Sequence, residues 1–344
     1  MVNQVGELIL AIETSCDETS VAIIEDGKRI KINIISSQIE THERFGGVVP
    51  EIASRKHVES ITRIIEQAIA EAQVKLSELS AIAVTQGPGL VGSLLVGVVS
   101  AKAMACALDL PLIGVHHIAG HIYANQLAHD LQYPLMALVV SGGHTELVHM
   151  EREGQFEIIG RTRDDAAGEA YDKVARALKL PYPGGPHIDR LAHEADHALD
   201  LPRAWLEPDS YDFSFSGLKS AVLAAINQAQ MRGAPLSPAQ VARGFQESVG
   251  DVLVGKSLRA VKQYGAKQLL LAGGVAANRG LRAALAASCA EAEIPLLVPP
   301  MQLCTDNAAM IGAAAFLKWK RQEFAPLDCK AEPLLPLESW IQAP

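Results

Sequence analysis

One pattern occurs twice in this chain and limits the folds that are open to it. Residues 8–27 (LILAIETSCDETSVAIIEDG) and 135–154 (LMALVVSGGHTELVHMEREG) share a buried strand, a short polar turn, and a second strand ending at a turn with glycine. A third strand is expected after each opening. Strands joined by tight turns pair antiparallel, because parallel neighbours need a crossover connection. The repeat therefore predicts a duplicated α/β fold with two mixed sheets rather than one doubly wound sheet.

The segments that follow each opening alternate between strand and helix periods. We expect helices over 51–72, 92–109, from about 119, after Asn278, and from near Asp306 to near Arg321, with strands over 81–86, 112–116, 267–273 and 295–299. Residues 166–264 are expected to form a largely helical insertion, with a loop rich in Pro and Gly at 181–186. The expected domains are 1–130 and 131–325, followed by a tail over 326–344. A duplicated fold of this kind has an interdomain cleft, where open α/β proteins place ligands.

Composition narrows the class of protein. A length of 344 residues suits two domains, and 49% hydrophobic with 20% charged residues indicates a globular chain. The formal charge of −9 means that a nucleic-acid substrate needs a local basic patch or a partner protein. Five cysteines without a CxxC pair, and no signal peptide, predict a cytoplasmic protein. The longest uncharged apolar stretch, Gly87–Ala101, is shorter than a membrane helix needs, so no membrane association is expected.

The segment GVHHIAGHIYAN carries candidate metal ligands. His117 and His121 are four residues apart, which places both imidazoles on one face of a helix. Such a pair alone is more often a surface or core feature. The spacing resembles that of zinc proteases, but Ile118 occupies the position of their catalytic Glu. Asp306 is, by itself, well explained as an acid or cap at the start of a helix; as a third ligand it completes a two-His, one-carboxylate set that suits iron or zinc.

Three glycine-bearing turns follow predicted strands, at 86–93, 139–145 and 269–280. Each alone is ordinary turn chemistry. Together they favour one large anionic ligand, such as a nucleotide, bound by backbone N–H groups. None matches the P-loop or a clean GxGxxG, which disfavours P-loop ATPases and Rossmann dehydrogenases.

Acidic residues supply further candidates with two open interpretations. Asp172 and Asp189 suit hydrogen bonds to ribose or base groups, and equally a solvated helix face. In the first turn, Glu13, Asp17 and Glu18 suit a divalent cation or an oriented water, and equally a simple turn.

Ten segments of the chain together resemble one enzyme family, and they run in order from residue 12 to residue 312. They are IETSCDETS, THERFGGVVPEIASRKHV, GPGLVGSLLVG, VHHIAGH, VVSGGHTEL, DDAAGEAYDKVAR, YPGGP, FSFSGLKSA, LAGGVAANRGLR and CTDNAAMIG. The combination is similar to the bacterial tRNA N6-adenosine threonylcarbamoyltransferases, formerly called glycoproteases. The resemblance implies an actin/Hsp70/sugar-kinase-like (ASKHA) fold of two duplicated domains.

The resemblance also implies a reaction, in which threonylcarbamoyl passes from threonylcarbamoyl-AMP to the exocyclic amine of the adenosine 3′ of the anticodon. The tRNAs are those that read codons beginning with A, and AMP leaves. The implied partners are a smaller paralogous ASKHA subunit and a small P-loop ATPase. The implied metal, iron or zinc, is bound by His117, His121 and Asp306. The implied substrate-binding residues are Val140, Ser141, Gly142, Gly143, His144, Asp172, Gly185, Asp189 and Asn278.

The chain departs from the family motif at Ala119, where bacterial members usually carry Glu. The ligands are unaffected, but any role of that Glu beside them or toward tRNA is missing here. An acyl-adenylate is already activated, so we expect no acyl-enzyme, and Glu13 is the candidate for the base or for its orientation. The alternative is an ATP-dependent kinase or chaperone-like ATPase of the same fold, which predicts Mg²⁺ bound with the nucleotide. A metalloprotease and a non-catalytic scaffold fit less well.

Overall fold

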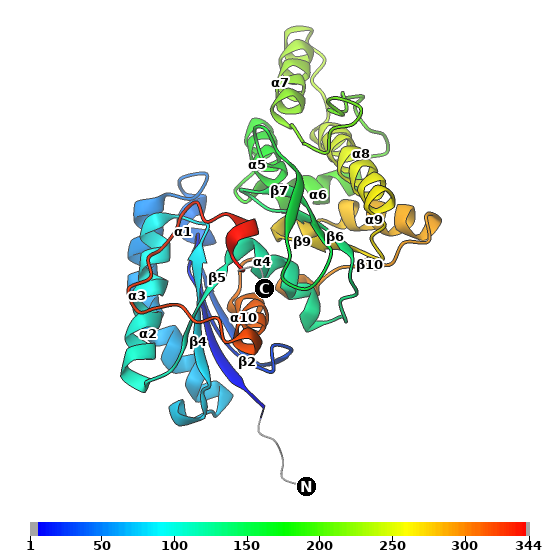
Figure 1. Ribbon diagram of the computed structural model, residues 1–344. Coiled ribbons are helices and arrows are strands. Elements are labelled where there is room, and N and C mark those ends of the chain that lie inside the picture. The colour runs from blue at the N-terminus through cyan, green and yellow to red at the C-terminus, as the bar shows by residue number, and fades with distance from the viewer. Residues whose placement is uncertain (1–5, 342–344) are drawn as a thin grey trace. The chain divides into compact units, whose positions relative to one another are not determined.

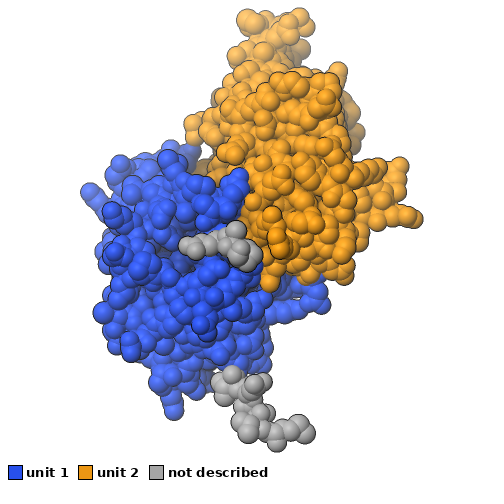
Figure 2. Space-filling view, viewed as in Figure 1, with its two compact units in different colours: residues 1–130, 305–344 blue, residues 131–304 orange. Residues whose placement is uncertain are grey.

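The computed structural model describes residues 6–341 and divides the chain into two compact units (Figures 1 and 2). Unit 1 comprises Met1–Asp130 and Thr305–Pro344, and unit 2 comprises Leu131–Cys304. The expectation that residues 305–325 belong to the second domain is therefore wrong. Helix α10 (Ala308–Arg321) packs on the sheet of unit 1, and a Cβ at Gly312 would lie 2.5 Å from Ile24 of that sheet. The small residues of α10 allow this close approach, which sequence periodicity alone does not reveal.

The sheet of unit 1 has the order β3-β2-β1-β4-β5. Its strands are β1 (Leu8–Glu13), β2 (Glu18–Glu25), β3 (Arg29–Ser37), β4 (Ala81–Gly87) and β5 (Leu112–His116). The first three strands pair antiparallel, and β4 and β5 extend the sheet in parallel with β1. Asp26 and Gly27, both with positive φ, form the tight turn between β2 and β3, which the Lys28 N–H closes by donating to the Glu25 carbonyl at 3.1 Å.

Helices cover both sides of this sheet (Figure 1). They are α2 (Pro50–Ala72), α3 (Val91–Leu108), α4 (His117–Tyr123) and α10; a short helix, α1 (Ile39–Glu43), follows β3. Helices α2 and α3 pack on one another and on the sheet, and α10 lies on the other side with α4. Every residue of β1 is buried, as expected for a central strand with two covered faces.

Unit 2 repeats the same strand plan, in the order β10-β9-β6-β7-β8. Its strands are β6 (Leu135–Val140), β7 (Thr145–Met150), β8 (Glu157–Arg161), β9 (Leu269–Ala272) and β10 (Leu296–Leu297). Here too three strands pair antiparallel, and two extend the sheet in parallel with the first. The predicted duplicated fold with two mixed sheets is confirmed, although β10 is shorter than the expected strand over 295–299.

The helices of unit 2 lie mostly between β8 and β9. They are α5 (Ala167–Ala177), α6 (Gly184–Glu194), α7 (Ser216–Met231), α8 (Pro238–Tyr264) and, after β9, α9 (Arg279–Glu291). The loop expected at 181–186 ends earlier, because α6 begins at Gly184. The carboxylate of Asp164 accepts hydrogen bonds from the hydroxyls of Ser214 and Ser216 and from the backbone N–H of Phe215, which fixes the start of α7.

Helix α3 is long and apolar enough to cross a membrane when judged by length and composition alone. This single helix is weak support for a membrane span, since core helices of soluble proteins pass the same test. In this structure α3 packs on α2 and β4.

Candidate metal centre and substrate site

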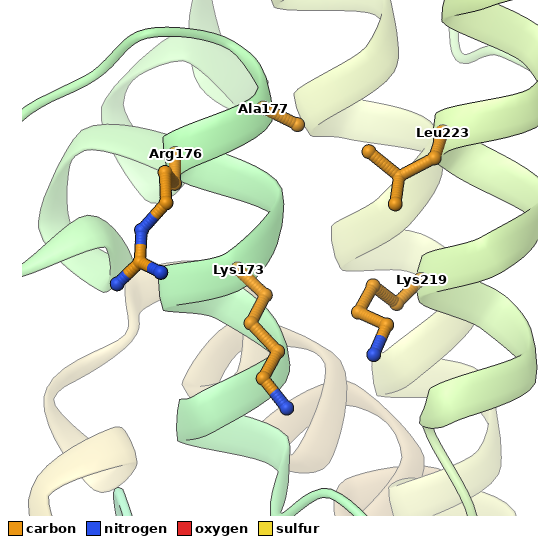
Figure 3. A pocket seen from close by; sticks show the side chains of 5 residues that line it. All are labelled: Lys173, Arg176, Ala177, Lys219 and Leu223. Atoms are coloured by element: carbon orange, nitrogen blue, oxygen red, sulfur yellow. The ribbon is translucent and has the colours of Figure 1, made fainter.

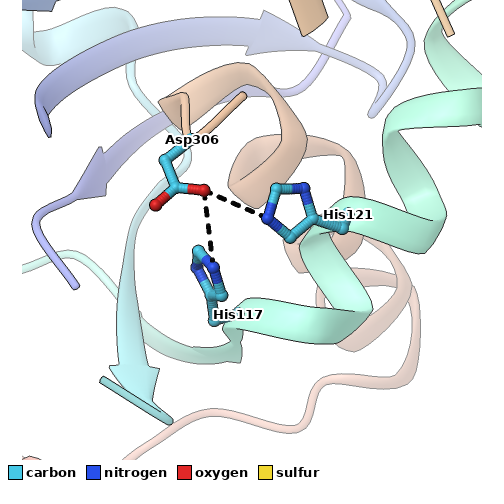
Figure 4. A group of neighbouring side chains, drawn as sticks. All are labelled: His117, His121 and Asp306. Carbon is cyan, nitrogen blue, oxygen red and sulfur yellow. Dashed lines mark ion pairs between the residues drawn. The ribbon is translucent and has the colours of Figure 1, made fainter. Parts of the chain in front are cut away.

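The three predicted metal ligands lie together in unit 1 (Figure 4). His117 and His121 are one turn apart on α4, which begins where β5 ends, and Asp306 lies just before α10. Asp306 Oδ1 is 3.5 Å from His117 Nε2 and 3.1 Å from His121 Nε2. One ligand atom from each residue lies within 4.8 Å of the others, which is the arrangement that one metal ion needs.

Local sequence explains why α4 and α10 approach so closely. A Cβ at Gly120 would lie 2.8 Å from the Ile311 Cδ1 and 3.3 Å from the Met310 Cγ, so glycine at this position allows α10 to pack closely without a shift of those side chains. Asn307, not Asp306, caps α10, since its Oδ1 accepts a hydrogen bond from the Met310 N–H at 3.1 Å. The alternative interpretation of Asp306 as the helix cap is therefore wrong, and its carboxylate faces the two histidines.

The chemistry of this group fits a transition metal. His121 is fully buried, and neither of its ring nitrogens makes a hydrogen bond of good geometry within the described residues; the Asp306 carboxylate is an ionic neighbour of Nε2 at 3.1 Å. Burying an imidazole without hydrogen bonds is costly, and a metal ion shared by Nε2 and Asp306 would offset that cost. Ala119, between the two ligands, is also fully buried.

Glu13 completes the surroundings of His117 from the end of β1. The fully buried carboxylate accepts hydrogen bonds from the Ser15 N–H at 2.5 Å and the Thr85 hydroxyl at 2.5 Å. Its Oε2 also lies 3.2 Å from His117 Nδ1, and the Ser15 hydroxyl lies 3.1 Å from the same nitrogen. The carboxylate and the Ser15 hydroxyl thus fix one ring nitrogen of His117 while the other ring nitrogen faces Asp306.

Glu13 and His117 each shift the pKa of the other. Burial by itself disfavours the charged form of His117, but the carboxylates of Asp306 and Glu13 outweigh it and raise the pKa of His117 to about 9. Burial would likewise raise the pKa of Glu13, yet the facing His117 holds it below its ordinary value. Without a metal ion, the site therefore favours a protonated His117 beside ionised carboxylates.

The other two acids of the first turn are not part of this group. Burial and the neighbouring Asp17 raise the pKa of Glu18 well above its ordinary value, and its Oε1 accepts a hydrogen bond from the Ser37 hydroxyl at 3.2 Å.

The predicted substrate-binding residues all lie in unit 2. Val140 ends β6, and Ser141, Gly142, Gly143 and His144 form the turn to β7. Within this turn the Ser141 N–H bonds to the His144 carbonyl at 2.8 Å, and the Ser141 hydroxyl accepts from the His144 N–H at 3.1 Å. Gly142 and Gly143 are exposed, with no atom within 4 Å of an added Cβ. The turn thus has a fixed base and an exposed glycine backbone at its tip.

Asp172 and Gly185 are brought together at the start of α6. The Gly184 N–H donates to Asp172 Oδ1 at 2.7 Å, and burial raises the pKa of Asp172 although the Gly184 and Gly185 N–H groups counter that rise. The Asp172 carboxylate therefore holds the first turn of α6.

Asp189 and Asn278 meet at the start of α9. Asp189 accepts hydrogen bonds from the Gly280 N–H at 3.2 Å and from Arg279 Nε at 2.9 Å. Asn278 caps α9 through the Leu281 N–H at 2.8 Å, and its Nδ2 donates to Gln246 Oε1, also at 2.8 Å. Gln246 was not predicted from the sequence, because nothing in its α8 segment distinguishes it from other polar helix residues.

Two duplicated mixed sheets define the ASKHA class of proteins, and the His-His-Asp group gives this chain a candidate metal centre. The solved structure of T. kodakarensis HypF is similar with a TM-score of 0.63, over 93% of this chain and 49% of HypF. Component A of the Acidaminococcus fermentans (R)-2-hydroxyglutaryl-CoA dehydratase gives a TM-score of 0.55, over 91% of this chain and 98% of that one. At 15% and 14% sequence identity these likenesses show the fold alone.

The chain belongs to the TsaD family, tRNA N6-adenosine threonylcarbamoyltransferase, whose family model matches residues 29–313. It is 64% identical to the protein of that name from Halalkalibacterium halodurans, over 97% of both chains. It is 63% identical to the Shouchella clausii protein, over 96% of this chain and 99% of the relative. The predicted family is confirmed, and the kinase or ATPase alternative is not favoured.

Proposed function

We propose that this chain transfers a threonylcarbamoyl group from threonylcarbamoyl-AMP to the exocyclic N6 amine of adenosine in tRNA, with release of AMP. The acceptor is the adenosine 3′ of the anticodon in tRNAs that read codons beginning with A. The observation that carries this proposal is the 64% identity, over 97% of the chain, to a relative named for this transfer. The cytoplasm, where tRNA is modified, is the proposed location.

The reaction is an acyl transfer from a phosphate oxygen of AMP to the N6 amine of adenosine. The adenine amine attacks the carbamoyl carbon, the bond from that carbon to the phosphate oxygen breaks, and AMP leaves with the electron pair. The amine nitrogen loses one proton, which passes to water. Because the donor is an activated anhydride, positioning and charge stabilisation supply the catalysis, and no acyl-enzyme is required.

In this proposal His117, His121 and Asp306 hold one iron or zinc ion. Bound there, the ion would supply a Lewis acid. Glu13 orients His117 rather than taking the substrate's proton, because its carboxylate already accepts from Ser15, Thr85 and His117. Carboxylates of this kind fix the ring and raise the basicity of a histidine ligand.

The β6–β7 turn is the proposed binding site of the acyl-adenylate. The exposed backbone at Gly142 and Gly143 offers N–H groups to phosphate oxygens, and Val140, Ser141 and His144 flank it. Asp172, Asp189 and Asn278 contribute differently, since their side chains secure the starts of α6 and α9. They shape the backbone around the adenosine, with Gly185 in the first turn of α6.

A basic surface for tRNA phosphates is proposed between α5 and α7. Lys173, Arg176 and Lys219, with Ala177 and Leu223, line a pocket of about 330 Å³ (Figure 3). The two lysine ammonium groups converge on Asp165, at 2.8 Å and 3.2 Å. A chain with a net charge of −9 needs such a local basic surface to hold RNA.

The proposed protein partners are a smaller paralogous ASKHA subunit and a small P-loop ATPase. We assign the paralogous subunit to the exposed apolar face of α2 and α3. On α3, Val91, Leu95 and Val99 recur every four residues and are 58%, 48% and 60% exposed, and Val58 of α2 is 65% exposed. An exposed apolar face on two packed helices is typical of a protein-binding surface.

The test combines metal analysis with reconstitution. Purified protein should contain about one iron or zinc, and His117→Ala and His121→Ala should lose it, as a site with only two ligands left binds weakly. His149→Ala is the matched control, because His149 is buried in unit 2 outside the donor group. Wild-type protein should then modify adenosine in unmodified tRNA when given synthetic threonylcarbamoyl-AMP and both partners. Absence of metal contradicts the metal centre, and absence of modified adenosine contradicts the transfer.

A further inference from the structure

The chain after α10 returns across unit 1 as an extended segment, residues 325–341, which we call the C-terminal strap (Figure 1, red). Few of its residues are helical, and hydrogen bonds to other elements of unit 1 hold the strap in place. The Ala325 N–H donates to the Leu112 carbonyl at 2.7 Å, and Lys102 Nζ donates to the Cys329 carbonyl at 2.9 Å. Farther along, Trp340 Nε1 donates to the Gly114 carbonyl at 2.9 Å. These hydrogen bonds join the strap to β5 and α3.

The strap also passes directly over the turn that follows β4. A Cβ at Gly87 would lie 1.9 Å from the Glu332 carbonyl oxygen, so only glycine fits beneath the strap. The Gly89 N–H donates to the Pro333 carbonyl at 3.3 Å, and the next N–H, of Leu90, donates to the Ser15 carbonyl at 2.8 Å. Ser15 is the residue whose hydroxyl lies 3.1 Å from His117 Nδ1. One chain of contacts therefore leads from the strap to a metal-ligand candidate.

A second and shorter route passes through His116, which is 2% exposed. Its Nδ1 accepts a hydrogen bond from the Ile118 N–H at 3.1 Å, which caps the start of α4. Its Nε2 lies 2.9 Å from the Leu335 carbonyl oxygen of the strap. Because Nδ1 accepts, Nε2 carries the proton and donates, so a single tautomer satisfies both contacts. His116 therefore ties the strap to the first turn of the helix that carries His117 and His121.

We propose that the C-terminal strap positions the metal-binding helix through His116, which makes His116 a positioning residue of the metal centre. Helix α4 has only seven residues, so its own hydrogen bonds do not fix its direction, and its cap and tertiary contacts do. Ligands must be held closely for tight coordination, and partners beyond the ligands supply much of that order. The proposal rests on the metal centre proposed above.

Two substitutions of His116 separate the cap from the strap contact. The oxygen of Asn lies near the position of His Nδ1, so His116→Asn keeps the cap and loses Leu335. The amide nitrogen of Gln lies near the position of His Nε2, so His116→Gln keeps the donor to Leu335. On the strap, Trp340→Phe removes the hydrogen bond to Gly114 and keeps a smaller aromatic side chain. Leu334→Ala is the matched control, because Leu334 is 90% exposed.

The readouts are Zn²⁺ affinity by competition with a chromophoric chelator, the visible absorption of the Co²⁺-substituted protein, and the melting temperature without metal. We expect His116→Asn to weaken Zn²⁺ binding about 10-fold and to alter the Co²⁺ spectrum, as removal of such partners typically does. We expect Trp340→Phe to act in the same direction, His116→Gln to retain more affinity than His116→Asn, and Leu334→Ala to match wild type. A chain ending at Leu334 loses both the Leu335 and the Trp340 contacts, so adding His116→Asn to that chain should cause little further loss.

The outcomes separate the two proposals. If wild-type protein binds neither Zn²⁺ nor Co²⁺, the metal centre itself fails. If wild type binds both, and His116→Asn and Trp340→Phe lower only the melting temperature, the strap serves stability alone and the positioning proposal is overturned. The point variants keep this test decisive even if the shortened chain does not fold.

Discussion

Glu13 and His117 form a buried pair, with the carboxylate Oε2 3.2 Å from Nδ1, while Nε2 of the same ring lies 3.5 Å from Asp306. The two residues are 104 positions apart and come from different elements, β1 and α4. A histidine held in this way presents one nitrogen to a metal ion in a fixed direction. The pair thus gives a structural role to an acid that the sequence offered as a candidate base, as part of a cation or water site, or as a residue of a simple turn.

The first prediction concerns this pair. Glu13→Gln should weaken zinc binding by about 10- to 100-fold, the usual range when a carboxylate behind a histidine ligand is lost. Chelator competition on folded protein measures it. Glu18→Gln is the control, since Glu18 is an acid of the same turn outside the donor group. Unchanged affinity in Glu13→Gln, with lost activity, would return Glu13 to the role of proton acceptor.

The second prediction is a pH dependence of the metal-free protein. The pKa of His117 rises from its ordinary 6.5 to about 9 in the folded state, so between these values the folded chain holds a proton that the unfolded chain has lost. The resulting stability is fully present below about pH 6.5 and falls as pH rises through about 9.

Urea unfolding of metal-free protein at pH 6, 7.5 and 9 measures this slope. His117→Gln should show a smaller decline over the same range, and an equal decline in both would refute the assignment to His117. Saturating zinc should reverse the trend, because coordination requires the neutral imidazole and releases a proton.

The third prediction tests the exposed face of α2 and α3. Leu95→Asp places a charge in the middle of the apolar row and should weaken binding of the paralogous subunit by more than about 10-fold. Calorimetric titration with the purified subunit measures it. Because Leu95 is 48% exposed, the variant should melt near the wild-type temperature. Leu334→Asp, with its 90% exposed side chain outside this face, is the control. Equal losses in both variants would argue against this surface.

The fourth prediction tests the basic pocket between α5 and α7. Lys219→Gln should weaken tRNA binding similarly for different tRNAs and reduce the slope of log K against log salt by about 1, as expected for one lost phosphate contact. Binding assays at several salt concentrations measure the slope. Lys262→Gln, an exposed lysine of α8 outside the pocket, is the control. An unchanged slope in Lys219→Gln would exclude this contact.

Much of the fold was predictable because it rests on local patterns. The hairpin openings alternate as strands do, and the Asp26–Gly27 turn has the residues that a tight hairpin needs. His117 and His121 could be paired from helical spacing alone. Their meeting with Asp306 depends on the packing of α10 against α4; the residues alone left Asp306 open between a third ligand and a helix cap, and the resemblance to a family favoured the ligand.

What the sequence left open involves partners far apart in the chain. The bonds from Asn278 to Gln246 and from His116 to Leu335 span 32 and 219 residues, and no local pattern marks either pair. The capping role of Asn307 was hidden for a different reason. Asp306 and Asn307 are both good N-cap residues, so composition could not choose between them.

The return of Thr305–Pro344 to unit 1 has a consequence for the order of events during synthesis. The N-terminal part of a chain leaves the ribosome first and begins to fold there. Here the first unit must wait for all of Leu131–Cys304 before Asp306, α10 and the strap arrive. Until then His117 and His121 lack the Asp306 carboxylate, so the proposed metal centre is incomplete on the nascent chain. We therefore expect metal to be bound only after the second unit has been made.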